Sequence, residues 1–287
     1  MSPAHGTVLV TGASTGIGAA VASHLDGLGI QVVAGVRREA DAEVVRRRGS
    51  GRISPVILDV SDPDSIASAM ATVAEVSGGA GLAGLVSNAG ISGGEPLEFA
   101  SLDGFRRMLE VNLVGAVAVT QAALPLIRSG RGRLVFIGSI GGRTPVPFTA
   151  AYAASKAGLA AVCDCLRGEL RPWRIHVALV EPGAVATPIW EKSTSASMER
   201  VAQLPADALA LYGRAVEVVG RVAEKTAAAA IPPERVARAV EHALTATRPR
   251  TRYLVGVDAR AQALVRRLPD KVRDRIVATY MGLPGPD

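Results

Sequence analysis

The chain reads Thr7-Val-Leu-Val-Thr11-Gly12-Ala-Ser-Thr-Gly16-Ile-Gly18 near its N-terminus, and the predicted architecture is built outward from this stretch. Thr7–Thr11 has the apolar, β-branched character of a short buried strand, and the pattern from Ala19 to Leu28 predicts a helix. Glycines between a strand and a helix can adopt positive φ and let the backbone approach a pyrophosphate, which the helix N-terminus stabilises. An ordinary glycine-rich turn remains the alternative, because the spacing departs from G-x-G-x-x-G.

Six further apolar runs predict strands, and helical patterns separate them: Gln31–Ala34, Ile53–Leu58, Leu82–Val86, Leu134–Ile137, Ile175–Val180 and Tyr253–Val255. This alternation predicts an α/β fold, a Rossmann-type doubly wound parallel sheet with helices on both faces and a ligand crevice at the carboxyl ends of the strands. To this fold we add a helical substrate lid. Hydrophobic residues make up 48% of the 287 residues and aromatic residues only 3%, so the core must consist of Ala, Val, Leu and Ile. We expect a single domain spanning residues 1–287.

Tyr152 and Lys156 lie four residues apart in Ala151-Tyr-Ala-Ala-Ser-Lys156. This spacing places a phenol and an ammonium group on one face of a helix. A tyrosine titrates near pH ~10, and a neighbouring positive charge favours its phenolate, which suits acid–base catalysis. The pair alone is weak evidence, because Tyr-x-x-x-Lys recurs by chance on amphipathic helices.

Further residues join the glycine turn and the Tyr152/Lys156 pair to make a larger set. They are, in chain order, Ser87-Asn88-Ala89-Gly90, Asn112, Ser139 and Pro182-Gly183. The set resembles the short-chain dehydrogenase/reductase family, densely from Thr7 to Thr187. The family more often has asparagine where this chain has Ser87. Because Asn88, Ala89 and Gly90 are kept, we expect this departure to be tolerated.

The resemblance implies reversible hydride transfer between a nicotinamide and a carbonyl carbon, with four catalytic residues. Tyr152 would give or take the proton of the oxygen. Ser139 would hydrogen-bond the carbonyl oxygen, where charge develops. Lys156 would bind the nicotinamide ribose hydroxyls and lower the tyrosine pKa, and Asn112 would anchor a water relay.

The resemblance also implies the cofactor contacts. They are Gly12, Ser14, Thr15, Gly16, Ile17 and Gly18 in the glycine turn, Asp59 and Val60 at the adenine, Asn88, Ala89 and Gly90 beneath the adenosine ribose, Tyr152 and Lys156, and Pro182, Gly183, Val185 and Thr187 around the carboxamide. Asp59-Val60 could equally be the helix cap before Asp62-Pro63.

The cofactor preference is predicted from the end of the second strand, Val32-Val-Ala-Gly-Val36-Arg37-Arg38. An acidic residue at this place holds a ribose 2′-hydroxyl, whereas an arginine accommodates a 2′-phosphate. Val36 replaces the acid, and Arg37 with Arg38 offers guanidinium groups, which predicts NADP(H) over NAD(H). The alternatives are that both arginines are surface residues, or that Glu39 serves the hydroxyl.

The substrate is predicted from the less regular segment 188–231, a candidate lid. Its apolar side chains recur at roughly helical spacings and are Ile189, Trp190, Met198, Val201, Leu204, Leu209, Leu211 and Tyr212. They would face Gly141, Gly142, Val146 and Phe148 across the pocket. We expect Ser139, Gly141, Val146, Phe148, Tyr152, Ile189 and Trp190 to contact substrate. The alternative is that the lid residues only pack the lid onto the core.

The run from Glu241 to Arg260 is similar to the retinol and hydroxysteroid dehydrogenases of the family, which implies a bulky hydrophobic alcohol, ketone or aldehyde, steroid- or retinoid-like. A 3-ketoacyl or small-ketone reductase is the alternative within the reductases. An epimerase or dehydratase of the extended family is disfavoured by the glycine spacing. A non-catalytic NADP(H)-binding sensor is the alternative of another class, and it would not need Tyr152 or Lys156.

Charge and targeting signals narrow the possible binding partners and the cellular location of the protein. The net charge is +6 and the pI about 9.8, but the basic residues are scattered without interleaved aromatics, which disfavours the binding of nucleic acid.

We expect no metal site, no membrane span and a cytoplasmic protein. Val111–Ile127 is expected to be a core helix, and Cys163 and Cys165 are expected to be unpaired, buried thiols. By resemblance we expect a homodimer or homotetramer. In the C-terminal extension 258–287, the amphipathic stretch Ala261–Ile276 could meet a membrane surface, another subunit or the lid.

Overall fold

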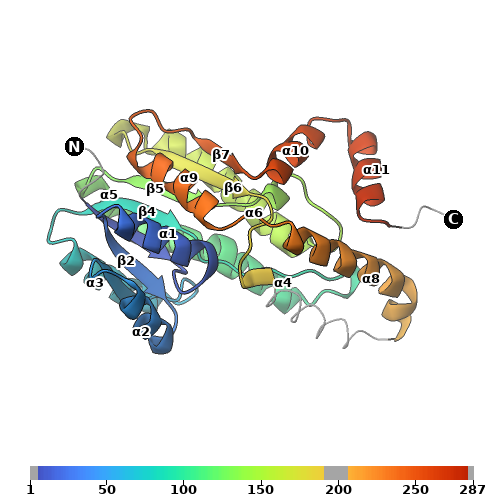
Figure 1. Ribbon diagram of the computed structural model, residues 1–287, viewed down its shortest axis with the longest axis horizontal. Helices are drawn as coiled ribbons and strands as arrows, with labels where there is room; N and C mark the ends of the chain where they lie inside the picture. Colours follow the sequence, from blue (N-terminus) through green and yellow to red (C-terminus); the bar gives the residue numbers. More distant parts are fainter. Residues whose placement is uncertain (1–5, 191–205, 284–287) are drawn as a thin grey trace.

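A seven-stranded parallel sheet forms the centre of the computed structural model, which describes residues 6–190 and 206–283 (Figure 1). The strand order is β3-β2-β1-β4-β5-β6-β7. The strands are β1 (Thr7–Thr11), β2 (Gln31–Val36), β3 (Ile53–Ile57), β4 (Leu82–Ser87), β5 (Arg133–Ile137), β6 (Val177–Pro182) and β7 (Arg252–Val255). All seven predicted strands are confirmed, with ends that differ by one or two residues.

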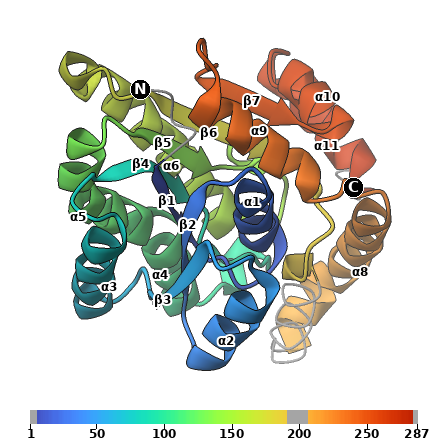
Figure 2. The ribbon, with the colours of Figure 1, turned by 60° about the vertical axis from the view of Figure 1, so that its left-hand side comes forward.

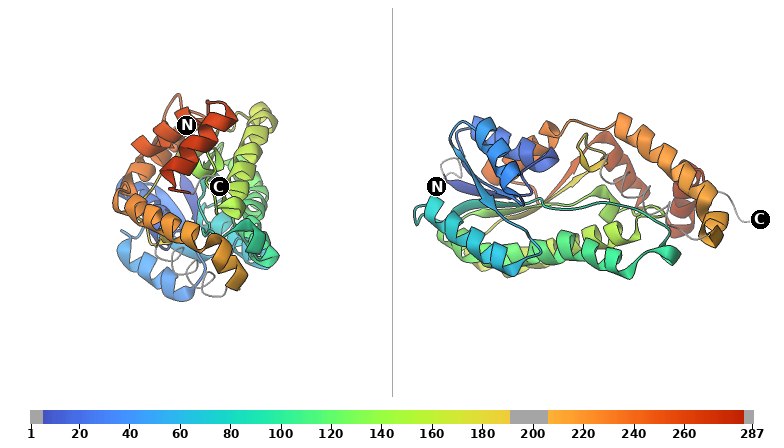
Figure 3. Two further views of the ribbon diagram at one scale, coloured as in Figure 1. Left: turned by 90° about the vertical axis from the view of Figure 1, so that its right-hand side faces the viewer. Right: turned by 90° about the horizontal axis from the view of Figure 1, so that it is seen from below.

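Helices cover both faces of this sheet, as Figure 3 shows in the view from below. One face carries α1 (Gly16–Gly27), α2 (Glu39–Arg48) and α9 (Glu234–Thr245), and the other carries α3 (Pro63–Val76), α4 (Leu102–Leu109), α5 (Gly115–Ser129) and α6 (Ala150–Glu169). Successive strand residues alternate between the two cores, so Val8 and Val10 pack on the α1 side and Leu9 on the α5 side. The predicted doubly wound fold is confirmed.

The chain runs outward from β1 to β3 and then returns to β4 on the other side of β1. This reversal creates a topological switch point, where ligands of open α/β sheets bind outside the carboxyl ends of the strands. The glycine turn follows β1 and the segment Asn88–Gly90 follows β4, so both lie at this point. Figure 2 shows α1 in front of the central strands.

The expected core helix is part of a longer continuous helix, Leu102–Ser129, which includes a π-helical turn at Glu110–Val114. By length and composition this helix would suffice to cross a membrane. Val119, Ala123 and Ile127 are nevertheless fully buried against the sheet. Its apolar character is therefore explained by core packing.

The segment predicted as a less regular lid contains a long regular helix, α8 (Ala206–Ala228). This helix agrees with the expectation of a helical lid, and its role as a lid stays a prediction. Met198, Val201 and Leu204 lie outside the described residues. Many of its residues are good helix formers, and the apolar spacing that we noted is helical. α8 extends beyond the sheet at one end of the molecule (Figure 1).

The amphipathic C-terminal stretch is split into α10 (Val257–Val265) and α11 (Asp270–Tyr280), because Pro269 interrupts it. The end of α11 packs on α8, where a Cβ on Gly282 would lie 2.8 Å from Val218 Cγ1. Of the three expected contacts of this stretch, the structure therefore contains the one with the lid helix.

The two cysteines differ in exposure, and their expected burial is wrong for one of them. Cys163 is fully buried, and burial raises the pKa of its thiol to about 12. Cys165 is exposed, because two residues along α6 turn the side chain to the solvent side of the helix. Neither forms a disulfide.

Candidate active site

The four predicted catalytic side chains come together at the carboxyl ends of β4 and β5. Tyr152 and Lys156 stand on α6, Ser139 follows β5, and Asn112 lies in the π-helical turn. A Cβ on Gly141 would lie 3.4 Å from Ser139 Oγ and 3.5 Å from Tyr152 Cε1, which places the serine hydroxyl beside the phenol ring. The expected grouping is present.

Burial governs the protonation of the Tyr152/Lys156 pair. Lys156 is 6% exposed, its Nζ donates to the carbonyl oxygen of Ile137 at 2.9 Å, and burial lowers its pKa to about 8. Burial raises the pKa of Tyr152, although a hydrogen bond from Ser139 acts in the opposite direction. The ammonium lies 6.0 Å from the centre of the phenol ring, and the expected lowering of the tyrosine pKa is outweighed by burial. Tyr152 is therefore neutral at neutral pH and keeps its phenolic proton.

Asn112 is held by a complete set of side-chain hydrogen bonds. Its Oδ1 accepts from the N–H of Ile91 at 2.8 Å, and its Nδ2 donates to the oxygen of Ile91 at 2.9 Å and to Ser155 Oγ at 3.1 Å. Ser155 Oγ in turn donates to the backbone oxygen of Tyr152 at 2.7 Å. The amide thus ties the segment after β4 to α6, and the water relay expected at Asn112 stays a prediction.

Ser155 was missed as a site residue by the sequence analysis. It lies within the quoted Tyr-Ala-Ala-Ser-Lys motif and is fully buried. A serine between two catalytic positions on a helix is the only signal that could have revealed it. The π-helical turn that places Asn112 leaves no such signal, although π-bulges often occur at functional sites.

The glycine turn forms a cradle that side chains would fill. Gly12 and Gly16 have φ of 65° and 59°, and a Cβ on Gly18 would lie 2.2 Å from the Gly12 oxygen and 2.5 Å from Asn88 Nδ2. Thr15 at the N-cap of α1 provides no side-chain hydrogen bond, and no acidic residue lies in the first turn. The first N–H groups of α1 are thus available to an anion, which fits the pyrophosphate of a dinucleotide.

Asn88 supports this cradle from the neighbouring strand. Its Nδ2 donates to the backbone oxygens of Thr11 at 2.9 Å and Gly12 at 3.1 Å, while Thr11 Oγ1 accepts from the N–H groups of Asn88 and Ala89, both at 2.9 Å. Ser87, the residue that departs from the family pattern, is buried within β4. The departure leaves these contacts in place.

Asp59 makes a local turn after β3. Its Oδ1 accepts from the N–H of Ser61 at 2.9 Å and from Ser61 Oγ at 2.7 Å. Burial acts to raise its pKa, but these hydrogen bonds and the charge of Arg37 lower it overall. Asp62 caps α3 by accepting from the N–H of Asp64 at 3.0 Å, so the alternative that Asp59 is the cap is wrong.

The two arginines after β2 have different surroundings. Arg38 donates two hydrogen bonds to the carboxylate of Asp41, from Nε and from Nη2, each at 2.9 Å. Arg37 is exposed, and within the described part of the chain no hydrogen bond or ion pair engages its guanidinium. Glu39 is also exposed and lies 4.0 Å from Arg46. Only Arg37 thus offers an uncommitted guanidinium at the end of β2.

The loop Pro182–Thr187 follows β6 and is held by residues far away in the chain. The N–H of Gly183 donates to the Val255 oxygen at 3.0 Å, and Ile231 exchanges backbone hydrogen bonds with Ala184 and Ala186, both at 2.9 Å. Trp190 Nε1 donates to the Val185 oxygen at 2.8 Å. The polar edge of Trp190 therefore fastens this loop, and its contact with substrate stays a prediction.

Asp258 at the start of α10 is a further anchor of this loop that the sequence analysis missed. Its Oδ2 accepts from the N–H of Ala184 at 2.7 Å. A Cβ on Gly183 would lie 2.0 Å from that oxygen, and a Cβ on Gly256 would lie 2.3 Å from Oδ1. The carboxylate thus occupies space that two glycines leave open, and Gly256-Val257-Asp258 after the last strand was the available signal.

A cleft of about 500 Å³ connects the glycine turn with the Pro182–Thr187 loop. Its walls come from α1, from the loop and its continuation, and from the start of α9: Gly16, Ala19, Ala20, Ser23, His24, Ala186, Pro188, Pro233 and Glu234. Gly16 and the loop approach closely, since a Cβ on Gly16 would lie 3.1 Å from Thr187 Cβ. The predicted pyrophosphate and carboxamide segments are therefore neighbours.

Helix α8 contacts the predicted opposite wall of the substrate pocket. The ring of Tyr212 on α8 lies edge-on to Phe148 at 6.2 Å and to Phe99 at 6.0 Å between centroids, and Tyr212 Oη donates to Glu98 at 2.8 Å. Phe99 and Glu98 belong to the short helix η2 (Leu97–Phe99) and were missed. Val146 is half-buried beside Phe148, whereas Ile189 is 37% exposed.

A family model described as short chain dehydrogenase matches residues 6–198. The chain belongs to the short-chain dehydrogenase family. This match includes the glycine turn and all four side chains that we predicted to be catalytic. The protein is therefore an oxidoreductase that acts on alcohols or carbonyls and uses a nicotinamide cofactor.

Three known proteins are similar to this short-chain dehydrogenase. Retinol dehydrogenase 5 of Mus musculus is 36% identical over 96% of this chain and 89% of its own length. The 17-beta-hydroxysteroid dehydrogenase type 6 of Bos taurus is 38% identical over 88% of this chain and 81% of its own length. The structure of an alcohol dehydrogenase from Thermococcus sibiricus, complexed with 5-hydroxy-NADP, is 28% identical, with a TM-score of 0.59 over 64% of this chain and 78% of that chain.

Replacing Asp258 with alanine should raise the dissociation constant for NADPH about tenfold. The change removes a charge-assisted hydrogen bond, worth about 1.5–3 kcal/mol, that holds the Gly183–Ala184 backbone of this short-chain dehydrogenase. Quenching of tryptophan fluorescence on titration with NADPH measures the constant. Asp258→Asn keeps an acceptor oxygen and should stay close to the wild type. An unchanged constant in Asp258→Ala would show that the loop does not need this anchor.

Proposed function

We propose that this short-chain dehydrogenase interconverts a bulky hydrophobic alcohol, steroid- or retinoid-like, with its ketone or aldehyde, and prefers NADP(H). The observation that carries the reaction type is the grouping of the half-buried Ser139 and Tyr152 with the buried Lys156. The substrate class is supported by the similarity to retinol dehydrogenase 5 and to 17-beta-hydroxysteroid dehydrogenase type 6. The aromatic cluster of Phe99, Phe148 and Tyr212 is suited to an apolar ligand.

In the proposed mechanism each catalytic side chain acts on the substrate oxygen or supports a residue that does. The nicotinamide, when bound, supplies or accepts the hydride. Ser139 donates a hydrogen bond to the carbonyl oxygen, and Tyr152 transfers its phenolic proton to that oxygen during reduction. Its raised pKa keeps the proton in place until the oxygen becomes basic. Lys156, with a pKa of about 8, replaces the proton of the tyrosine after turnover.

The preference for NADP(H) rests on Arg37. Its guanidinium follows β2, the strand next to β1, and it has no carboxylate partner within 4 Å in the described residues. Arginine binds phosphate oxygens through its planar fork of donors, so a 2′-phosphate would satisfy it. The nearby carboxylate of Asp59 is held by Ser61. We further propose that the protein is a cytoplasmic homo-oligomer, dimer or tetramer.

A substrate comparison tests this proposal. We expect NADPH oxidation with retinaldehyde and a steroid ketone to have kcat/KM values at least about tenfold above those for a small aromatic ketone and a β-keto thioester, because an apolar pocket gains ~25 cal/mol for each Å² of apolar surface that it buries. Absorbance of NADPH measures all four under identical conditions. A higher value for the β-keto thioester would replace the proposed substrate class with that of a ketoacyl reductase. NADPH binding without turnover of any carbonyl would favour a non-catalytic sensor.

A further inference from the structure

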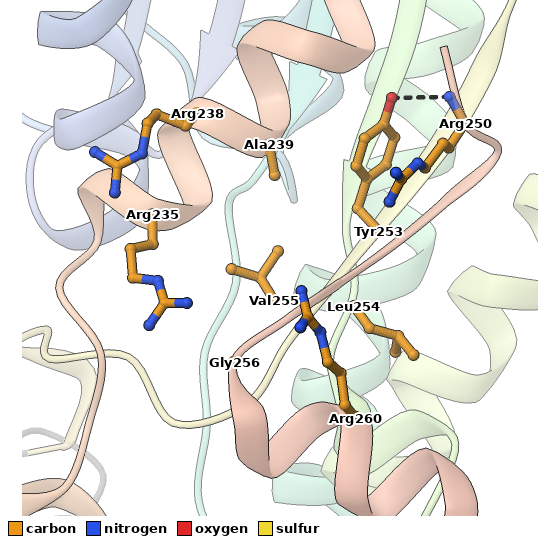
Figure 4. Close-up of a pocket in the computed structure, with 9 residues that line it drawn as sticks. All are labelled: Arg235, Arg238, Ala239, Arg250, Tyr253, Leu254, Val255, Gly256 and Arg260. Carbon is orange, nitrogen blue, oxygen red and sulfur yellow. Dashed lines mark hydrogen bonds between the residues drawn. The ribbon is translucent and has the colours of Figure 1, made fainter.

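A second pocket opens beside β7, the strand at one edge of the sheet (Figure 4). Its cavity has about 220 Å³ and lies between α9 and the junction of β7 with α10. The lining residues are Arg235, Arg238, Ala239, Arg250, Tyr253, Leu254, Val255, Gly256 and Arg260. Four of these nine residues are arginines, and none of them is acidic.

The four arginine charges are not balanced by neighbouring carboxylates. No ion pair within 4 Å joins any of the four guanidinium groups to an acidic side chain in residues 6–190 and 206–283. The acidic residues adjacent to these segments are Glu234 and Asp258, and Asp258 is engaged by the N–H of Ala184. In Figure 4, Arg250 and Arg260 extend toward Val255 from opposite directions, Arg235 approaches from α9, and Arg238 lies at the rim.

Hydrogen bonds hold the floor of the pocket in place. Tyr253 is 7% exposed, and its Oη accepts from the N–H of Arg250 at 2.9 Å and shares a hydrogen bond with His242 Nδ1 at 2.9 Å. The turn that carries Arg250 is thereby fastened to α9, the helix that carries Arg235 and Arg238. The arginine side chains are thus attached to a fixed backbone around one concavity.

These features point to an anion. A concave site lined by one sign of charge concentrates its field and attracts counter-ions, and guanidinium groups bind phosphate oxygens in pairs. The cavity is smaller than the ~300–1,000 Å³ of pockets for drug-sized ligands, so it suits a small ion or a headgroup. We propose that the pocket of Arg235, Arg238, Arg250 and Arg260, here called the four-arginine pocket, binds a phosphate-bearing anion of pyrophosphate size.

This site is separate from the dinucleotide site and does not depend on the proposed substrate. None of the predicted cofactor contacts lines the four-arginine pocket. The two sites are nevertheless linked through the backbone, because the oxygen of Val255 in the pocket accepts from the N–H of Gly183 in the predicted carboxamide loop. A bound anion would therefore lie behind the loop that holds the nicotinamide.

Calorimetric titration with pyrophosphate tests the site. The protein is first loaded with NADPH, so that the phosphate-binding turn at Gly12–Gly18 is filled. We expect saturable binding of one pyrophosphate, with an affinity at least about tenfold lower in Arg250→Ala/Arg260→Ala, because hydrogen bonds to charged groups contribute about 1.5–3 kcal/mol. Arg266→Ala/Arg267→Ala is the matched control, since it removes two exposed arginines that follow α10 and do not line the pocket. This control should bind pyrophosphate like the wild type.

Flotation with vesicles distinguishes the two sources of such a phosphate. Phosphatidylcholine vesicles that contain phosphatidic acid should retain the wild type, and lose it on addition of pyrophosphate, if the natural ligand is a lipid headgroup. Saturable pyrophosphate binding without vesicle binding assigns the pocket to a free phosphate compound. The proposal is overturned if the wild type binds no pyrophosphate saturably, or if both double variants lose the same affinity, because surface charge alone would then explain the binding.

Discussion

Replacing Tyr152 with phenylalanine is expected to lower kcat for carbonyl reduction by about 10²–10⁴-fold, the usual contribution of a general acid or base. The phenylalanine keeps the ring beside Gly141 and removes only the hydroxyl that Ser139 contacts. The dissociation constant for NADPH should stay near that of the wild type. Steady-state NADPH oxidation and an NADPH titration measure both quantities on the same preparations.

A matched control for this variant is Tyr212→Phe, which removes another tyrosine hydroxyl near the predicted pocket. That hydroxyl donates to Glu98, and Tyr212 stands on α8 rather than beside Ser139. We expect Tyr212→Phe to change KM more than kcat. If Tyr152→Phe kept kcat within a factor of about three while Tyr212→Phe lost it, Tyr152 would not be the proton donor.

Replacing Arg37 with alanine is expected to weaken NADPH binding by about 10–100-fold and leave NADH binding nearly unchanged. The change removes charge-assisted hydrogen bonds to a 2′-phosphate, worth about 1.5–3 kcal/mol, that NADH cannot form. Direct titrations with both dinucleotides give the two dissociation constants. The ratio of the constants, rather than either value alone, reports the preference.

Arg38→Ala provides the matched control, because Arg38 is already paired with Asp41 through two hydrogen bonds. It removes the same charge one residue away and should change the ratio by a factor of about two or less, the usual scale of an exposed, screened charge. Equal losses in both variants would mean that general positive potential, and not a contact of Arg37, attracts the phosphate. An unchanged ratio in Arg37→Ala would end the assignment.

The strands and the catalytic motif were predictable because their signals are local. Buried parallel strands must be apolar throughout, so Val8–Val10 and Leu134–Ile137 are visible in the sequence as continuous runs. The glycine turn is equally visible, since positive φ at Gly12 and Gly16 demands glycine there. The spacing of Tyr152 and Lys156 is also local, although the pair became informative only together with the glycine turn and the other residues of the family pattern.

Other features depend on contacts between distant segments, which no local pattern encodes. Asp258 reaches Ala184 across 74 residues, and Tyr212 reaches Glu98 across 114. The exposure of Cys165 depends on which face of α6 meets the sheet. The pKa of Tyr152 was expected to fall beside Lys156, but desolvation of its hydroxyl within the site raises it. Burial is a property of the assembled fold.

Transfer of deuterium to a product alcohol tests the assigned reaction most directly. Retinaldehyde is incubated with the protein and NADPH that carries deuterium at both positions of nicotinamide C4, and the product is analysed by mass spectrometry. We predict retinol with a single deuterium on the carbinol carbon, formed by the wild type and not by Tyr152→Phe. Retinol without deuterium, or equal labelling by both proteins, would contradict hydride transfer with Tyr152 as the proton donor.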